Sequence, residues 1–185
     1  MKVRMKKAIL IIAGLVIFFA AKAQNSSDKI FASALNKIIN DYPNDFNNLK
    51  GKKISESSFD TVWESSEKIP GYVNASIKYF ATITSWVTTF ITTSDSVEAI
   101  NKYNEISEKI FKVKFDCGLL FEDNSPKDES DLKSTELAVI RVSPGKDEKF
   151  SGMLLHLRVT STSVLSKEYE VTLEIEESLG YKLLH

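Results

Sequence analysis

A long stretch of alternating side chains lies near the middle of the chain, between Tyr72 and Thr92. Its odd positions are mostly apolar and its even positions mostly polar, a period typical of a β-strand. One strand of about 20 residues would span roughly 66 Å, whereas a domain of this size is about 40 Å across. The segment must therefore fold back or bend, and we place the reversal between Ala81 and Ser85.

Other segments with strand character lie on both sides of this stretch. Residues 59–65 alternate and are followed by the turn signal Pro70-Gly71, so we expect them to pair with residues 72–80. Later segments with strand character are 137–142, closed by a turn at 143–147, then 155–160 and 169–176. In the last of these, we expect Leu173 in the core and Glu174 in solvent.

Two segments have the period of amphipathic helices. In the first, Ser27 or Asp28 is the expected cap, and the helix ends between Asn40 and Pro43. The second begins at residues 93–96, where Ser94 or Asp95 can cap, and ends near Val113. The expected apolar faces are Ile30, Phe31, Ala34, Leu35, Ile38 and Ile39 in the first helix, and Val97, Ile100, Tyr103, Ile106, Ile110 and Phe111 in the second.

The order of these elements predicts the fold class. We expect an α+β protein with an antiparallel sheet of about five to six strands and two helices on one face, in the order α-β-β-(β)-α-β-β-β. Residues 44–53, closed by Gly51, are expected to form a polar connection, and the acidic stretch 116–135 a loop.

The first 23 residues have the pattern of an export signal. Four basic residues precede an apolar segment, 8–21, which is followed by the small-x-small sequence ending at Ala23. We expect cleavage between Ala23 and Gln24, leaving one domain of residues 24–185 in the periplasm or outside the cell. Because the apolar segment is shorter than the ~20 residues that span a bilayer, we expect no stable membrane insertion after cleavage.

Removal of this segment changes the charge of the protein. The segment holds five of the 24 lysines and arginines and none of the 25 acids, so the remaining chain carries 19 basic residues and a net charge of −6. An acidic chain does not favour non-specific binding to nucleic acid or anionic lipid. The single cysteine, Cys117, provides no disulfide framework.

The residues needed for common catalytic sites are scarce. The chain has two histidines, the C-terminal His185 and His156, which we expect to pair with Glu170, Glu174 or Glu176 across strands. The acids of the 116–135 loop lack the alternating ligands and central glycine of a hand-type calcium loop. We therefore expect no metal, no other cofactor and no catalytic residue.

Three aromatic residues are unusual because of their position. Phe80, Trp86 and Phe90 lie on the even positions of the central stretch, among threonines. One interpretation is that the helices cover this part of the sheet, or that a bulge changes the parity of the strand. The other is an exposed platform for a sugar, a peptide or a partner protein. We favour the buried arrangement and retain the three residues as the candidate ligand-binding site.

Two short motifs resemble a known group of proteins. The pattern Phe46-x-x-Leu49-Lys50-Gly51, followed by Ile69-Pro70-Gly71, is similar to small secreted proteins of Gram-negative bacteria that have no assigned function. This resemblance implies no active site. The order of elements is also similar to that of small secretion-chaperone-type α/β proteins, which is an analogy of layout.

Two functions are consistent with these features of the sequence. The first is a monomeric, non-enzymatic binding module that holds a protein, peptide or glycan on its sheet face or an edge strand. The second is a small hydrolase that works with paired carboxylates. Convergence of two carboxylates in one cleft with an aromatic wall would distinguish the hydrolase.

Overall fold

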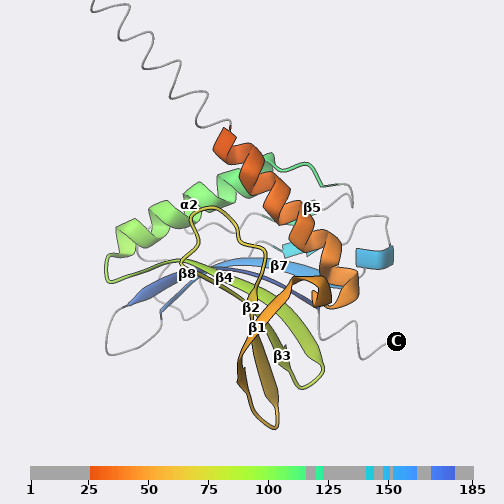
Figure 1. Ribbon diagram of the computed structural model, residues 1–185. Helices are drawn as coiled ribbons and strands as arrows, with labels where there is room; N and C mark the ends of the chain where they lie inside the picture. Colours follow the sequence, from red (N-terminus) through yellow and green to blue (C-terminus); the bar gives the residue numbers. More distant parts are fainter. Residues whose placement is uncertain are drawn as a thin grey trace, which may run out of the picture.

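The computed structural model describes residues 26–115, 120–122, 141–143, 148–150, 152–161 and 168–177. Two α-helices lie on the same side of a six-stranded antiparallel sheet in this part of the chain (Figure 1). This confirms the predicted α+β class and the placement of the helices. The predictions for the export signal, with its cleavage between Ala23 and Gln24, and for Cys117 and His185 fall outside the described residues.

The main sheet has the strand order β1-β2-β3-β4-β8-β7, and every neighbouring pair is antiparallel. A second, two-stranded sheet joins β5 to β6. The strands are β1 (Lys50–Glu56), β2 (Asp60–Ser65), β3 (Asn74–Phe80), β4 (Ile83–Thr93), β5 (Leu120–Glu122), β6 (Arg141–Ser143), β7 (Met153–Ser161) and β8 (Tyr169–Glu177).

The central stretch is a hairpin whose turn consists of two residues, Ala81 and Thr82. Ala81 has a φ of 55°, the left-handed conformation that such tight hairpin turns require. A two-residue turn inverts the parity of the second strand, so Ile77 on β3 lies opposite Trp86 on β4. Residues that lie opposite each other share a face of the sheet. The even positions of β4 therefore join the odd positions of β3 beneath the helices.

The core lies between the helices and this face of the sheet. The first helix, residues 26–41, contributes Phe31, Leu35 and Ile38, and α2 (Ser96–Lys112) contributes Tyr103 and Ile106. The sheet contributes Trp86 and Phe90 from β4 together with alternate residues of β7 and β8: Leu155, Leu157, Val159, Val171, Leu173 and Ile175. The predicted alternation of β7 and β8 is thus confirmed.

The start of α2 is also confirmed. Asp95 is the N-cap, and its side chain accepts hydrogen bonds from the backbone N–H groups of Val97 and Glu98, at 2.9 and 3.3 Å. These bonds satisfy two donors that have no partner within the helix. A cap of this kind fixes where the chain leaves β4 and turns back over the sheet.

The prediction of a polar connection over residues 44–53 is confirmed for residues 44–49 and wrong for residues 50–53. Two short 3-10 turns, Tyr42–Asn44 and Asn47–Leu49, lead directly into β1. Gly51 is not a turn residue but part of β1, where a Cβ atom would lie 2.8 Å from the carbonyl oxygen of Glu64. The strand escaped prediction because its sequence, Lys50 to Glu56, has one apolar residue, Ile54, and no covered face.

Several helix predictions also need correction. Ser27 and Asp28 lie within the first helix and not at its cap. Ile30 is 60% exposed, and Val97 and Phe111 of α2 are also exposed, since each lies at the margin of its apolar face. In the later part of the chain, β5 forms inside the stretch predicted as a loop, and β6 (residues 141–143) includes the end of the predicted strand 137–142 and the first residue of the predicted turn.

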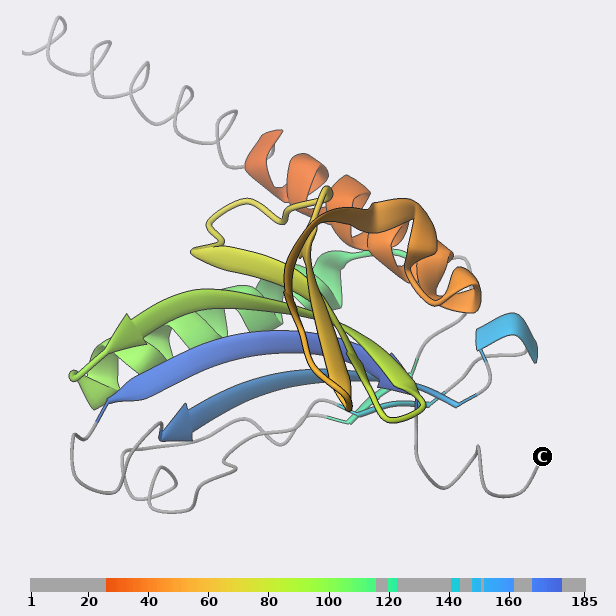
Figure 2. The ribbon, with the colours of Figure 1, turned by 60° about the horizontal axis from the view of Figure 1, so that its bottom comes forward.

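The sheet has two unlike regions. We call residues 50–65 and 74–82, which form β1, β2, β3 and their tight turns, the arm, and the two helices with β4, β7 and β8 the body. Figure 1 and Figure 2 show the arm curving away from the helices, so that the distal ends of its strands have no helix above them. The two regions are joined where Trp86 Nε1 donates a 2.9 Å hydrogen bond to the hydroxyl of Ser65, in the core.

Candidate functional site

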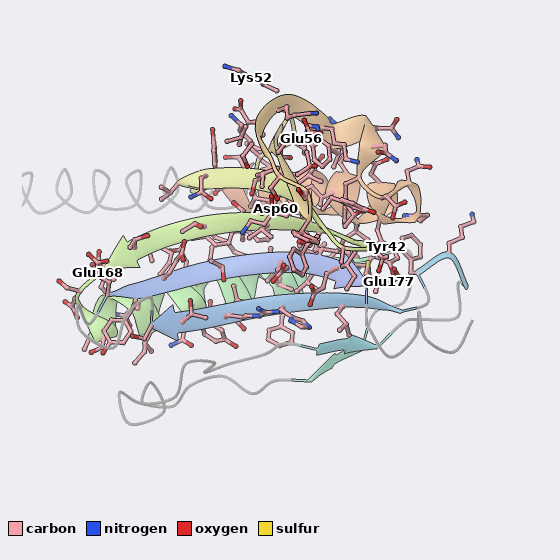
Figure 3. The ribbon with its side chains drawn as sticks, turned by 90° about the horizontal axis from the view of Figure 1, so that it is seen from below. Tyr42, Lys52, Glu56, Asp60, Glu168 and Glu177 are labelled. Atoms are coloured by element: carbon pink, nitrogen blue, oxygen red, sulfur yellow. The ribbon has the colours of Figure 1, made fainter. Side chains whose placement is uncertain are left out.

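The curvature of the sheet creates a hollow of about 310 Å³ on the face away from the helices. Its volume lies at the lower end of the range for ligand sites, about 300–1,000 Å³. Figure 3 looks on to this face, with Lys52, Glu56 and Asp60 marking the arm. The lining residues come from five strands: Ile54, Val62, Asn74, Ala75, Ser76, Lys78, Val87, Thr89, Glu170 and Thr172.

The floor of this concave-face hollow is apolar and its margin is polar. Val87 is buried at the floor, and Ile54 stands at one wall with 62% of its surface exposed. On the β8 side, the Thr89 hydroxyl donates a 2.7 Å hydrogen bond to Glu170 Oε1. Lys78 contributes a cation from β3. An apolar floor with a few polar groups at the margin is typical of sites that hold an apolar group and orient what is attached to it.

The structure does not bring the three predicted aromatic residues together on an open face. Trp86 is fully buried and Phe90 nearly so, both beneath the helices, whereas Phe80 is 64% exposed at the end of the arm. The parity inversion at the two-residue turn buries Trp86, and an irregularity in the β4–β8 register between Thr89 and Ile91 accommodates Phe90. The three side chains therefore form no shared platform.

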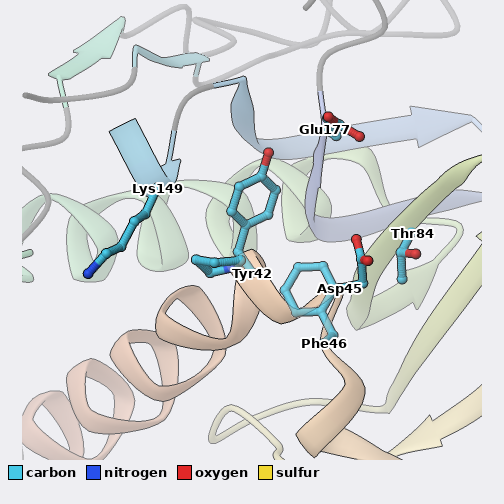
Figure 4. A pocket seen from close by; sticks show the side chains of 7 residues that line it. Tyr42, Asp45, Phe46, Thr84, Lys149 and Glu177 are labelled. Carbon is cyan, nitrogen blue, oxygen red and sulfur yellow. The ribbon is translucent and has the colours of Figure 1, made fainter. Parts of the chain in front are cut away.

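A second, smaller cleft of about 190 Å³ lies at the end of the first helix. Figure 4 shows Tyr42 near its centre, with Lys149 on one side and Asp45, Thr84 and Glu177 on the other. We call this the helix-end cleft. Two carboxylates and an aromatic side chain thus line one cleft, as a carboxylate-dependent hydrolase would need, together with a specific spacing of the two carboxyl groups.

The helix-end cleft is shaped by the turn that follows the first helix. The buried Asp41 carboxylate accepts hydrogen bonds from Asn44 Nδ2 at 3.2 Å and from the backbone N–H and side chain of Asn48 at 3.1 and 2.6 Å. This network holds Asp45 and Phe46 in the left-handed conformation, with φ of 53° and 54°. Such a conformation costs roughly 1–2 kcal/mol per residue. Complete burial of Phe46 offsets that cost and leaves Asp45 in the cleft.

His156 lies against charged side chains on the face of β7 and β8 that points away from the helices, where it is buried. Its Nδ1 lies 3.7 Å from Glu176 Oε1 and in contact with Arg158 Nη2, and Arg158 Nη2 lies 3.3 Å from Glu174 Oε2. The predicted cross-strand partners Glu174 and Glu176 are both among these side chains, whereas Glu170 accepts from Thr89 instead.

Two kinds of feature are absent from the described ranges. No group of three or more His, Cys, Asp or Glu side chains within them is arranged to hold a metal ion. No helix among them is long and apolar enough to span a membrane.

Sequence reasoning missed both hollows. Ile54 and Val62 lie on the undetected β1 and its partner β2, and Val87 was assigned to the same face as Ile77 because the turn position was not fixed. A two-residue turn beginning at Ala81 places Val87 opposite Ser76, and therefore on the other face of the sheet from Ile77. The helix-end cleft joins Asp45 to Glu177 across more than 130 residues of sequence, and no local pattern relates the two.

Comparisons with protein families, with curated proteins and with solved structures found no match. The resemblance to small secreted proteins therefore stays a prediction, and functional inference depends on the geometry of the two hollows.

Proposed function

We propose that the protein is a non-enzymatic binding module that holds a segment of a protein or peptide on the concave face of its sheet. The supporting observation is the concave-face hollow, in which exposed Ile54 and buried Val87 form an apolar surface open to solvent. An exposed isoleucine inside a hollow has unfavourable contact with water that a ligand would remove.

The composition of the hollow favours a peptide over a glycan. None of its ten lining residues is aromatic, so it offers no flat ring on which a sugar could stack. An apolar side chain can enter over Val62 and Val87 while Asn74, Ser76 and Thr172 meet polar backbone groups of the ligand. Export to the periplasm or the outside of the cell is part of this proposal, since it follows from the N-terminal sequence alone.

The sheet face is favoured over an edge strand because both edges are obstructed. β1 forms one edge, but it has two register irregularities and carries Lys50, Lys52 and Lys53. Bulges and lysines are features that prevent the addition of another strand. At the other edge, β6 lies beside β7. A ligand that only extended the sheet would have to overcome these features.

The experiment uses two isoleucines of almost equal exposure. Peptides are selected from a random displayed library on the wild-type protein and then tested against Ile54→Glu and Ile30→Glu. Ile54 is 62% exposed in the hollow and Ile30 is 60% exposed on the first helix, so both variants should fold.

We expect the selected peptides to lose at least about tenfold in affinity for Ile54→Glu, the equivalent of about 1.4 kcal/mol, and to retain their affinity for Ile30→Glu. Equal binding to both variants, or no enrichment of peptides on the wild-type protein, would count against the concave-face hollow as the site.

The helix-end cleft favours a second candidate, a small carboxylate-dependent hydrolase. Asp45 and Glu177 would act as acid and base, or as acid and nucleophile, with Tyr42 as the aromatic wall. The test is hydrolysis of a panel of chromogenic aryl glycosides by the wild-type protein, Asp45→Asn and Glu177→Gln. Turnover that both variants lose would support this candidate, and absence of turnover by the wild type would reject it for these substrates.

A further inference from the structure

The end of the arm carries the most exposed aromatic side chains in the described part of the chain. Phe59 is 75% exposed and Phe80 is 64% exposed, and Tyr79 beside it is also exposed. Phe59 lies in the turn between β1 and β2, and Phe80 is the last residue of β3 before the turn to β4. Two neighbouring turns therefore present two phenyl rings to solvent. We call these residues the aromatic tip.

The aromatic tip is held by hydrogen bonds on both turns. Ser57 Oγ accepts from the backbone N–H groups of Phe59 and Asp60 at 3.2 and 3.1 Å, and the Ser57 N–H donates to the Asp60 carbonyl at 2.8 Å. The Ala81 N–H donates to the Phe59 carbonyl at 3.1 Å, which ties one turn to the other. Because the backbone is fixed in this way, the turns themselves need not become ordered when the rings contact a partner.

Folding alone gives no reason for these rings to be exposed. Neither Phe59 nor Phe80 belongs to the core, and each exposes apolar surface that water opposes. The two turns that form the aromatic tip project from the sheet on the side away from the helices (Figure 1). A projecting apolar tip meets a flat surface before the rest of the described chain does.

Lysines outnumber acids along the strands that lead to the aromatic tip. The acids Glu56 and Asp60 lie next to the turn of Phe59, whereas Lys50, Lys52 and Lys53 lie farther back along β1. Residues 50–60 and 76–83 carry four lysines and two acids, although the chain without its first 23 residues has a net charge of −6. Figure 3 shows Lys52 pointing outward from the arm. Lys78, two residues before Phe80, and Lys52 on β1 lie behind the exposed rings. This order matches a phospholipid surface, where rings enter the apolar boundary and ammonium groups meet the phosphates outside it.

We propose that the aromatic tip inserts into the surface of a phospholipid bilayer, with Phe59 and Phe80 in the interfacial region and Lys52 and Lys78 at the headgroups. The shape favours a bilayer over a protein partner. A stable protein interface buries about 800 Å² on each side, for which a partner would need a surface shaped to the projecting turns, whereas a bilayer adapts to a convex tip. This contact goes beyond the proposed ligand site and does not depend on it.

The test uses tryptophan as a reporter of depth in the full-length chain. Phe59→Trp, Phe80→Trp and, as the matched control, Phe111→Trp are mixed with vesicles of phosphatidylcholine and phosphatidylglycerol whose acyl chains are brominated, because bromine quenches only tryptophan that enters the bilayer. Phe111 is an exposed phenylalanine on α2, away from the arm, and the native tryptophans give the same background in every variant. An attachment through residues 8–21 would be common to all variants.

We expect loss of fluorescence at positions 59 and 80 and none at position 111. Adding Lys52→Glu and Lys78→Glu should reduce that loss on these anionic vesicles. Quenching at position 59 no greater than at position 111 would overturn the proposal, and unchanged quenching in the lysine variants would overturn the headgroup contact.

Sedimentation velocity without vesicles tests the alternative partner, a second copy of the chain. A dimer that Phe59→Ser/Phe80→Ser converts to a monomer would show that the aromatic tip is a protein interface and would overturn the proposal. The same sedimentation coefficient for both proteins supports it.

Discussion

The body and the arm share the alternation of strand side chains, but these side chains have different surroundings in the two regions. In the body, alternate residues of β7 and β8 such as Leu157 and Leu173 are fully buried under the helices, and the other residues carry paired charges such as Arg158 and Glu174. In the arm, both parities of the distal strands are exposed, including large apolar residues. A strand that lacks a covering helix gains little from alternation, so its side chains are available for contacts outside the chain.

The largest difference between the two regions is expected at one pair of aromatic residues. Trp86→Ala removes a fully buried ring and the hydrogen bond to Ser65, and we expect a loss of about 3–5 kcal/mol in the free energy of unfolding. Phe80→Ala should change it by less than about 0.5 kcal/mol, because the ring is mostly exposed. Urea denaturation of both variants measures the difference, and similar losses would show that the end of the arm is as tightly packed as the core.

A second comparison lies within β8. Leu173→Ala should cost about 2–5 kcal/mol, as do other truncations of buried leucine. Glu174 faces the other side, where its carboxylate pairs with Arg158 and is only 19% exposed. We expect Glu174→Ala to cost up to about 1 kcal/mol, less than the core truncation and more than a fully solvated position. Chemical denaturation at pH 7 measures the loss of stability in the two variants. Equal losses would contradict the expectation that Leu173→Ala costs more.

The attachment of β1 depends on a close backbone approach at Gly51. A Cβ atom there would lie 2.8 Å from the carbonyl oxygen of Glu64, so Gly51→Ala should force β1 away from β2 at a cost of about 1–3 kcal/mol. Gly71→Ala is the control, with no atom within 4 Å of the added Cβ but a positive φ of 85°, and should cost about 1 kcal/mol. Thermal denaturation ranks the two variants, and a Gly51→Ala protein as stable as the wild type would mean that β1 adapts freely.

The smallest expected effect concerns an ion-pair group on α2. Burial opposes ionisation of Glu105, but hydrogen bonds from Lys102 and Lys109 outweigh it and hold the pKa of Glu105 below its ordinary value of 4.5. A lowered folded-state pKa stabilises the protein above the unfolded pKa, and this contribution is lost as the pH falls through the folded pKa.

Because the Glu105 side chain is 43% exposed, the contribution is at most about 0.5 kcal/mol. We expect Glu105→Gln to be slightly less stable than the wild type at pH 7, and the difference to shrink as the pH falls below 4.5. A difference that persists at the lower pH would mean that the substitution acts through helix propensity and not through charge.

The predictability of the fold also differs between body and arm. The alternation of β7 and β8, the apolar face around Leu35 and the cap at Asp95 are local signals, and sequence reasoning identified all of them. The arm depends on features without a local signal. β1 has no covered face, and Ala81 stands in a turn position usually held by asparagine or glycine.

The candidate sites were less predictable than the fold for the same reason. The concave-face hollow needs the register of five strands, which follows from the position of the Ala81 turn and from a strand that the pattern does not reveal. The helix-end cleft needs the tertiary placement of Asp45 against Glu177. Sequence patterns report which face of an element is buried, but they do not report which exposed faces meet.

Native-state hydrogen exchange tests the division into body and arm most directly, because it measures the free energy of opening at each amide. We predict that amides in the β4–β8 ladder, such as those of residues 171–175, exchange only through global unfolding. Amides in the distal β2–β3 ladder, residues 60–63, should exchange through local opening at a lower free energy. Equal opening free energies in the two ladders would contradict the account, since the arm would then be as firmly held as the core.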